Sequence, residues 1–264
     1  MRLVALDIGN TKMVAGLVDA GRLELVFPQT DELAHCGLER KVAQIHDWCI
    51  ERLREGTERK GIDALVISSV VPASLELWRH LWNGREATRD VPQIIVHPGL
   101  ALPYAIDIHR PETIGADRLC NVGGALALGL SRAIVVDLGT ANTYDLLWEG
   151  RFVGGLIGPG FDLAHRTLAQ GTAQLPSVPF ARPEELLGRD TAAAITSGSF
   201  HQAVGAVSHV VQSLWDRYPD CPVLLTGGLA AVVGSELPFS VLHHPHLTLE
   251  GAAFLAEHVL RTSS

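Results

Sequence analysis

The sequence has few cysteines and no closely spaced pair of them. The four cysteines are Cys36, Cys49, Cys120 and Cys221, so no Cys-x-x-Cys unit is present to form half of a zinc site. Four scattered cysteines in 264 residues also do not build the dense disulfide framework of small secreted domains. We therefore expect reduced thiols and a cytoplasmic protein.

Long apolar runs and an excess of basic residues are lacking too. No stretch of 18 uncharged apolar residues occurs, and the apolar run after Met1 is interrupted by Asp7, so neither a membrane-spanning helix nor a secretory signal is expected. The 21 basic and 29 acidic side chains give a formal charge of -8, which disfavours nucleic acid and anionic membranes as partners. A hydrophobic content of 47% excludes disorder, so small molecules are the expected partners.

The sequence does contain an internal repeat at nearly half its length. Residues 3–23 read LVALDIGNTKMVAGLVDAGRL and residues 133–153 read AIVVDLGTANTYDLLWEGRFV, so Asp7 aligns with Asp137. In both copies an apolar run ends at Asp-x-Gly, a hydroxyl-rich stretch and a second apolar run follow, and Ala-Gly-Arg or Glu-Gly-Arg forms a turn. This pattern predicts that each half opens with a β-hairpin whose first turn carries an aspartate.

Helical and strand-like segments alternate after each hairpin. The pattern predicts helices over residues 37–55, 75–82 and 191–217, and strands over residues 64–68, 93–96 and 222–225. Asp190 can cap the last of these helices. Such alternation favours an α/β chain with sheets covered by helices, and we place two lobes at residues 1–115 and 116–264.

Aromatic and histidine residues outside these motifs have simpler interpretations. Trp78 and Trp82 are four residues apart, so they are predicted to share one face of their helix and to serve as core or interface anchors. His243, His244 and His246 surround Pro245 without a regular acidic or cysteine partner, which favours an exposed loop over a metal site.

Glycine-rich turns follow three of the strand-like runs. They are Asp7-Ile8-Gly9-Asn10-Thr11-Lys12, Asp137-Leu138-Gly139-Thr140-Ala141-Asn142-Thr143 and Thr226-Gly227-Gly228. Glycine lets backbone N–H groups approach a phosphate, and two aspartates suit a hydrated Mg²⁺ ion that also binds substrate phosphates. No Walker A motif and no Rossmann fingerprint is present. A single Asp-x-Gly is usually only a turn, but its duplication favours a phosphate site.

The turns DIGNT and DLGTANT, together with TGG, resemble the phosphate and adenosine loops of the superfamily of acetate kinase, sugar kinases, heat-shock chaperones and actin. Four further blocks look like type III pantothenate kinase, in that family's order. They are Gly115-Ala116-Asp117-Arg118, Gly154 to Gly160, Thr172 to Pro176, and Gly188 to Thr191. The resemblance implies an α/β fold of two duplicated ribonuclease-H-like or actin-like lobes, with mixed sheets covered by helices and an ATP cleft between them.

The resemblance also implies nucleotide and cation sites. The ATP-binding residues would be Asp7, Ile8, Gly9, Asn10, Thr11, Lys12, Met13, Val14 and Thr140. Asp7 would hold Mg²⁺, and Lys12 would lie near the β or γ phosphate. Asp137 would bind the monovalent cation, K⁺ or NH₄⁺, that the family requires.

For the substrate, the resemblance implies that Asp117 is the general base. Pantothenate would be bound by Tyr104, Gly115, Ala116, Asp117, Arg118 and Thr191. Thr191 would come from the neighbouring subunit of a homodimer. The family's GTATT reads Gly139-Thr140-Ala141-Asn142-Thr143 here, and its GxNT reads Gly188-Arg189-Asp190-Thr191, so fine contacts differ while the acid–base residue is intact.

The implied reaction is transfer of the ATP γ-phosphoryl group to the primary hydroxyl of pantothenate, which gives 4'-phosphopantothenate in the first step of coenzyme A biosynthesis. Two alternatives stay open at this point: a non-catalytic regulatory accessory protein of the same fold, and a superfamily kinase for another hydroxyl substrate. The joint presence of Asp7, Asp117, Arg118 and Asp137 favours an enzyme, because a regulatory module has no need of metal, base and cation carboxylates together.

Overall fold

The computed structural model describes residues 1–27, 37–54, 61–86 and 88–262, so Cys36 lies outside the described residues. The chain divides into two compact units, one formed by Met1–Gly129 with Leu247–Ser264 and one by Leu130–His246. This division differs from the predicted boundary after residue 115. Helices α4 (Ala116–Ala127) and α8 (Leu247–Thr262) both belong to the first unit, because they pack closely against each other there.

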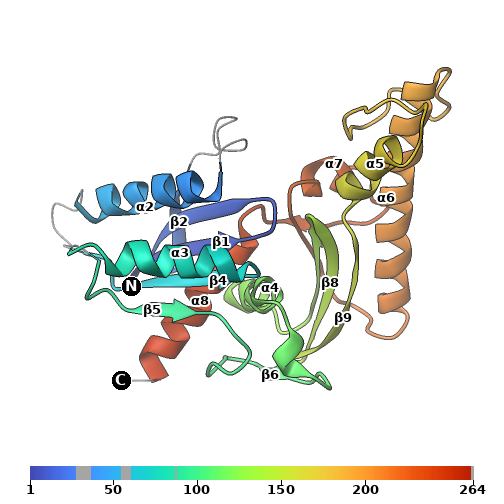
Figure 1. The fold of residues 1–264 in the computed structure, drawn as a ribbon. Helices are drawn as coiled ribbons and strands as arrows, with labels where there is room; N and C mark the ends of the chain where they lie inside the picture. Colours follow the sequence, from blue (N-terminus) through green and yellow to red (C-terminus); the bar gives the residue numbers. More distant parts are fainter. Residues whose placement is uncertain (28–36, 55–60, 87, 263–264) are drawn as a thin grey trace. The chain divides into compact units, whose positions relative to one another are not determined.

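A five-stranded mixed sheet forms the first unit, in the order β3-β2-β1-β4-β5 (Figure 1). Its strands are β1 (Arg2–Ile8), β2 (Met13–Asp19), β3 (Arg22–Val26), β4 (Ala64–Ser69) and β5 (Gln93–Ile95). Strands β1, β2 and β3 are antiparallel neighbours, whereas β4 and β5 are parallel to β1. The predicted hairpin is confirmed, and its Ala20-Gly21 turn has φ values of 49° and 76°, which suit a type I′ turn.

Helices α2 (Leu38–Arg54) and α3 (Pro72–Asn83) cover one face of this sheet. Trp78 and Trp82 are fully buried there, with stacked rings whose centroids lie 6.0 Å apart, so the prediction of a shared helix face is confirmed. Both predicted helices are confirmed. Helix α3 begins earlier than expected because Pro72 is compatible with the first helical turn, where no backbone hydrogen-bond donor is needed.

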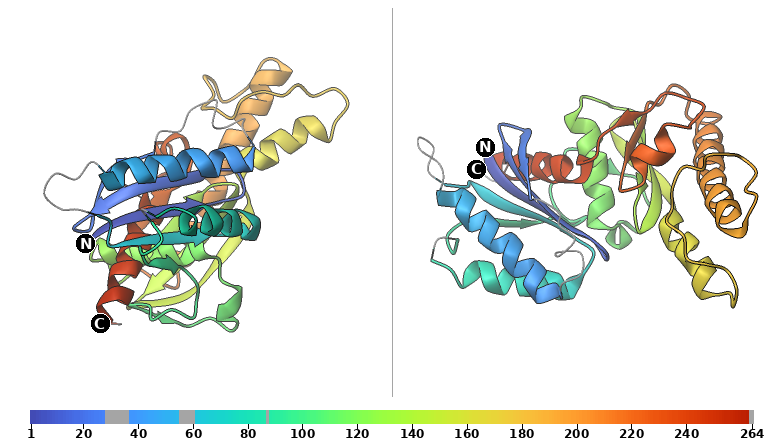
Figure 2. Two further views of the ribbon diagram at one scale, coloured as in Figure 1. Left: turned by 60° about the vertical axis from the view of Figure 1, so that its left-hand side comes forward. Right: turned by 90° about the horizontal axis from the view of Figure 1, so that it is seen from above.

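Helices α4 and α8 cover the other face of the sheet, and glycines bring them close together (Figure 2). A Cβ atom on Gly251 of α8 would overlap the carbonyl oxygen of Cys120 in α4. A Cβ atom on Gly124 of α4 would lie 2.6 Å from Leu247 Cδ1. At Gly251 the backbone of α8 therefore packs against the backbone of α4, and at Gly124 the backbone of α4 packs against a side chain of α8.

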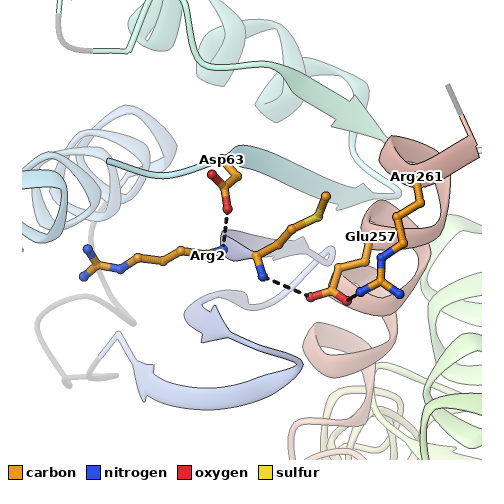
Figure 3. A network of polar contacts seen from close by, with 5 residues as sticks. Arg2, Asp63, Glu257 and Arg261 are labelled. Carbon is orange, nitrogen blue, oxygen red and sulfur yellow. Dashed lines mark hydrogen bonds and ion pairs between the residues drawn. The ribbon is translucent and has the colours of Figure 1, made fainter. Parts of the chain in front are cut away.

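The start of β1 is tied to α8 and to the segment before β4 (Figure 3). The amino group of Met1 lies 4.0 Å from Glu257 Oε1, and the other oxygen of Glu257 lies 3.1 Å from Arg261 Nη2. The backbone N–H of Arg2 donates to Asp63 Oδ2 at 2.8 Å. Such surface pairs contribute about 0–1 kcal/mol each, so they orient the strand rather than stabilise the unit strongly.

The second unit repeats the strand order of the first, β9-β8-β7-β10-β11 against β3-β2-β1-β4-β5. Its strands are β7 (Ala133–Leu138), β8 (Ala141–Trp148), β9 (Arg151–Pro159), β10 (Val223–Thr226) and β11 (Leu242–His243). Glu149 and Gly150 form the second hairpin turn with φ values of 52° and 71°. The predicted duplication is therefore confirmed at the level of topology.

Helices α6 (Thr191–Trp215) and α7 (Ala230–Gly234) pack on one face of this second sheet, and α5 (Phe161–Gln170) contacts α6. The predicted helix over 191–217 is confirmed. So is its cap, because the Asp190 side chain accepts a hydrogen bond of 2.8 Å from the backbone N–H of Ala193. The segment between β5 and α4 holds only the short strand β6 (Ala105–Ile106) and a 3₁₀ turn at Pro111–Thr113.

Three of the four cysteines lie in the described part of the chain. Cys49, Cys120 and Cys221 are free and buried. Burial raises the pKa of the Cys49 thiol, which therefore stays protonated. None of the helices described here combines the length and the apolar character that a membrane span requires.

Candidate functional site

In the first unit, Asp7 lies at the C-terminal end of β1 between two neighbouring strands. It is opposite Val14 of β2 and beside Ser68 of the parallel strand β4. The Ser68 hydroxyl donates a hydrogen bond of 2.9 Å to Asp7 Oδ1. Leu6 and Ile8 point into the core under α2 and α3, so the intervening Asp7 points to the opposite face. The C-terminal ends of parallel strands are the usual ligand sites of α/β sheets.

The turn after Asp7 exposes the part of the predicted phosphate stretch that can reach a ligand. Asn10, Thr11 and Lys12 are exposed, and the Gly9 N–H donates to the Lys12 carbonyl oxygen at 2.9 Å. Ile8 and Met13 direct their side chains into the hydrophobic core. Of the predicted stretch, these two residues therefore offer a ligand only their backbone groups, and Val14 is half-buried.

The first turn of α4 carries the predicted base. One oxygen of Asp117 accepts a hydrogen bond of 2.8 Å from the backbone N–H of Arg118. Gly115 is the N-cap residue, and a Cβ atom there would overlap Asp117 Oδ1. Glycine at this position thus leaves room for the carboxylate, and the positive end of the helix dipole favours its charge.

The other predicted pantothenate residues of this unit gather around the same helix. The Tyr104 hydroxyl donates to the Leu119 carbonyl oxygen of α4 at 2.8 Å, and Tyr104 is buried. Ala116 is buried and Arg118 is half-buried. The structure therefore brings Tyr104 and the Gly115–Arg118 block together at one end of α4.

Cys120 joins the Asp7 strand end to the Asp117 helix. It lies one helical turn after Asp117, is fully buried, and lies near Ser68 of β4. Burial raises the pKa of the Cys120 thiol well above its usual range, and the negative charges of Asp7 and Asp117 raise it further. Both carboxylates therefore lie within electrostatic reach of one buried thiol.

In the second unit, Asp137 occupies the same place at the end of β7. Thr143 of β8 lies opposite it and Thr226 of the parallel strand β10 lies beside it. Gly227 has φ of +94°, and a Cβ atom there would lie 2.5 Å from Asp137 Oδ1. Thr143 Oγ1 is buried and makes no hydrogen bond within the described part of the chain. Asp137 is thus surrounded by oxygen-bearing side chains and by close backbone.

The turn after Asp137 is shorter than the one after Asp7. The Gly139 N–H donates to the Ala141 carbonyl oxygen at 3.2 Å, and Thr140 is exposed at the tip. A Cβ atom on Gly160 would overlap the carbonyl oxygens of Gly139 and Thr140. The end of β9 therefore closes directly onto this turn and fixes its backbone.

Thr191 lies elsewhere in the second unit, at the first position of α6. It is exposed and follows the Asp190 cap. A Cβ atom on Gly188 would overlap the backbone nitrogen of Ala194, so the chain passes close to the helix just before the cap. Thr191 and the Asp137 turn are thus carried by different elements of this unit, α6 and the β7–β8 hairpin.

Metal binding by protein groups alone is not supported in the residues that the structure describes. No three His, Cys, Asp or Glu side chains gather there in a way that could hold a metal ion, and His243, His244 and His246 form no such group. A single carboxylate such as Asp7 can nevertheless be enough to bind Mg²⁺. This ion takes one or two protein carboxylates and completes its coordination shell with phosphate oxygens and water.

Comparison with known proteins now identifies the family, because residues 3–213 match the sequence model of type III pantothenate kinase. The chain belongs to the type III pantothenate kinase family. A type III pantothenate kinase of Streptomyces avermitilis is 35% identical over 271 residues, with 97% of each chain covered. One of Agathobacter rectalis is 30% identical, with 94% of each chain covered.

Among solved structures, the ROK hexokinase of Thermus thermophilus aligns with a TM-score of 0.53 at 16% identity, covering 99% of this chain and 100% of that one. At this identity the likeness concerns the fold. The predicted actin-like fold of two duplicated lobes is therefore confirmed. Membership of the pantothenate kinase family confirms an ATP-dependent phosphotransferase that acts at the first step of coenzyme A biosynthesis.

Two residues of this region were missed by the sequence-based interpretation. Ser68 stood at the end of the predicted strand ALVIS, and Cys120 was interpreted only as a reduced thiol. Ser68 could have been predicted as a site residue, because it lies at the C-terminal end of a parallel strand next to β1. No local pattern indicated Cys120, because its contact with Ser68 depends on how α4 packs on the sheet.

Proposed function

We propose that this chain transfers the γ-phosphoryl group of ATP to the primary hydroxyl of pantothenate, with Asp117 as the general base. The observation that carries the proposal is the arrangement of the first unit. A carboxylate at the end of β1 and a carboxylate at the first turn of α4 both lie near the buried Cys120 thiol, and both match positions of the family's motifs.

Asp117 would orient the substrate hydroxyl and accept its proton late in the reaction. Phosphoryl transfer passes through a loose transition state, so placement of the hydroxyl matters more than the strength of the base. The Arg118 N–H holds one carboxylate oxygen, and Gly115 leaves the space in which the carboxylate sits. These two features keep Asp117 in one orientation.

The exposed turn from Asn10 to Lys12 would bind the ATP phosphates, with Asp7 as the Mg²⁺ ligand. The donor chemistry fits, because a carboxylate oxygen is a hard ligand and Mg²⁺ accepts few protein ligands besides phosphate oxygens. When Mg²⁺ is bound, it neutralises part of the negative charge on the β and γ phosphates. Lys12 would add a positive charge near these phosphates, and Thr140 of the second unit would contact ATP.

Asp137 would hold the monovalent cation, K⁺ or NH₄⁺. The surroundings fit an oxygen-coordinated cation, because Asp137 faces Thr143 across the β7–β8 pair and Thr143 Oγ1 is buried without a hydrogen bond in the described residues. A buried hydroxyl oxygen in this position gains a partner when a cation is present.

Pantothenate would be bound by Tyr104, Gly115, Ala116 and Arg118, with Thr191 supplied by the neighbouring subunit of a homodimer in the cytoplasm. Support for self-association comes from apolar side chains of the second unit that are exposed in a single chain. They are Leu156 and Ile157 of β9, Leu163 and Leu168 of α5, and Leu186 and Leu187 before α6. The formal charge of -8 disfavours nucleic acid or an anionic membrane as the partner that covers these side chains.

A coupled assay of ADP release tests the proposal. We expect ADP to form only when both ATP and pantothenate are present, and to form faster with K⁺ or NH₄⁺ than with Na⁺. A pantothenate analogue that lacks the primary hydroxyl is the matched control and should release no ADP. Absence of pantothenate-dependent ADP with every cation would contradict the proposed function, and ADP release with a different alcohol would favour the alternative substrate.

A further inference from the structure

Ser68 is a buried hydroxyl placed between the two carboxylate-bearing elements of the first unit. Its side chain has no exposed surface, and its hydroxyl donates to Asp7 Oδ1 at 2.9 Å. The next residue, Ser69, is a useful contrast, because its hydroxyl is hydrogen-bonded to the backbone N–H and carbonyl oxygen of Val71, both at 3.2 Å. Two adjacent serines at one strand end therefore have different surroundings.

The hydrogen-bond directions at Ser68 follow from its single proton. That proton is donated to the Asp7 carboxylate. The charge of the carboxylate strengthens this hydrogen bond, and the complete burial of Ser68 keeps water from competing for it.

Helix α4 packs beside β4, and α8 fixes its position. A Cβ atom on Gly251 of α8 would overlap the Cys120 carbonyl oxygen, so α4 rests directly on α8 at this residue. Cys120 is fully buried and lies near Ser68. The Ser68–Asp7 hydrogen bond is therefore enclosed by packed elements rather than by water.

We propose that Ser68 is a positioning residue for Asp7. The Ser68 bond fixes the rotation of the Asp7 carboxylate, so that its metal-binding oxygen points in one direction. The proposal rests on the proposed function in one respect, namely that Asp7 is the Mg²⁺ ligand. Removal of such an outer partner weakens metal binding by about 10- to 100-fold in other sites.

Mn²⁺ binding in the presence of a non-hydrolysable ATP analogue tests this directly. The bound fraction is measured by electron paramagnetic resonance for the full-length wild type, Ser68→Ala and the matched control Ser69→Ala. We expect Ser68→Ala to bind Mn²⁺ about 10-fold more weakly or worse, and Ser69→Ala to match the wild type within about twofold. Equal Mn²⁺ affinity of Ser68→Ala and wild type would overturn the proposal.

A purely structural role is separated by two further variants. Ser68→Thr keeps the hydroxyl and should restore Mn²⁺ binding, and Thr226 at the corresponding register of the second unit indicates that such a strand end accepts threonine. In an Asp7→Asn background, Ser68→Ala should cause no further loss of Mn²⁺ affinity, because its partner is already altered. Fully additive losses would overturn the proposal.

Circular dichroism shows whether each variant is folded. Where Ser68→Ala does not fold, Ser68→Cys replaces the hydroxyl with a thiol of similar shape but weaker donor strength, and it should also weaken Mn²⁺ binding. Unchanged Mn²⁺ affinity in a folded Ser68→Cys would overturn the proposal. Absence of pantothenate-dependent ADP release in the wild type would contradict the proposed function alone, because Mn²⁺ binding needs no phosphoryl acceptor.

Discussion

Asp7 and Asp137 end equivalent strands of two sheets with the same topology, but different groups hold them. In the first unit a serine hydroxyl from the neighbouring parallel strand bonds the Asp7 carboxylate. In the second unit the Asp137 carboxylate lies against Gly227, where no side chain fits. The same backbone plan thus carries a serine that bonds the aspartate at one strand end and a closely approaching glycine at the other.

This difference matches the roles proposed for the two aspartates. A carboxylate tethered through a hydroxyl keeps its charge and a defined orientation, which suits a metal that must meet substrate phosphates. A carboxylate enclosed by backbone and hydroxyl oxygens suits a cation that stays in place. The duplication therefore supplied two similar scaffolds, and the residues beside each aspartate made them different.

The largest effect is expected at Asp117 on α4. The motifs of the second unit contain no residue that corresponds to Asp117. Asp117→Asn should lower kcat by about 100- to 10,000-fold, because the proton acceptor is lost. Binding of a non-hydrolysable ATP analogue should stay within about twofold, since Asp117 is not proposed to touch the nucleotide. Steady-state kinetics and calorimetric titration measure the two quantities.

Asp162 is the matched control, because it also lies in the first turn of a helix, α5. Asp162→Asn removes a surface pair with Arg166 and should leave kcat nearly unchanged. Near-normal kcat in Asp117→Asn would remove Asp117 as the base.

The second prediction concerns stability and contrasts backbone with side-chain support. Gly227→Ala should lower the free energy of unfolding by about 2–5 kcal/mol, because it combines a left-handed residue with a steric overlap at Asp137. Ser68→Ala should cost only about 1–2 kcal/mol, the value of a buried hydrogen bond. Urea unfolding of both variants measures the difference.

A glycine without such contacts is available as a control. Gly205 lies inside α6, and a Cβ atom there would meet no other atom within 4 Å, so Gly205→Ala should be neutral or stabilise the helix by about 0.5–1 kcal/mol. A stable Gly227→Ala would contradict the view that backbone contact holds the Asp137 strand end.

The third prediction uses the different cations of the two strand ends. Asp137→Asn should raise the K⁺ concentration needed for half-maximal activity by about tenfold, because one ligand charge worth about 1.4 kcal/mol is lost. The Mg²⁺ dependence of this variant should be unchanged. Kinetics at varied K⁺ and fixed Mg²⁺, and then the reverse, measure both; a shift confined to Mg²⁺ would contradict the assignment.

The smallest effect is expected from His46, a buried residue of the first unit that packs edge-on against Trp78 and Trp82. Burial lowers the pKa of His46 below 6.5, and Arg85 lowers it further, whereas Asp47 at 3.6 Å opposes the shift. The unfolded chain therefore takes up a proton at higher pH than the folded chain. Stability is lost as the pH falls through 6.5 toward the folded pKa.

Urea unfolding at pH 7.5 and at pH 5.5 measures this effect, which amounts to about 1.4 kcal/mol for each unit by which the pKa is lowered. In His46→Gln the difference between the two pH values should shrink. An unchanged difference would show that other groups cause the pH dependence.

The sequence predicted the parts of the fold that depend on local pattern. The hairpins followed from the repeat, and the α6 cap followed from Asp190. The division of the chain did not, because the return of α8 to the first unit rests on contacts between residues far apart, such as Gly251 with Cys120. The local sequence of α8 does not indicate which of the two units the helix packs against.

The candidate site followed the same rule. Asp7, Asp117 and Asp137 stood in motifs, so the sequence alone indicated them. The hydroxyl beside Asp7 and the thiol behind it lie on other elements, and they meet only when β4 pairs with β1 and α4 packs on the sheet. Motifs thus indicate candidate ligand-binding groups, whereas the groups packed beside them depend on the tertiary structure.

The return of α8 to the first unit has a consequence for how the chain is made. Residues 130–246 form a continuous unit inserted within a discontinuous one. The second unit is made from one uninterrupted stretch, so all its contacts lie within residues 130–246. The first unit instead needs residues 247–262 to cover its sheet beside α4, so its folding requires segments separated by the whole of the second unit.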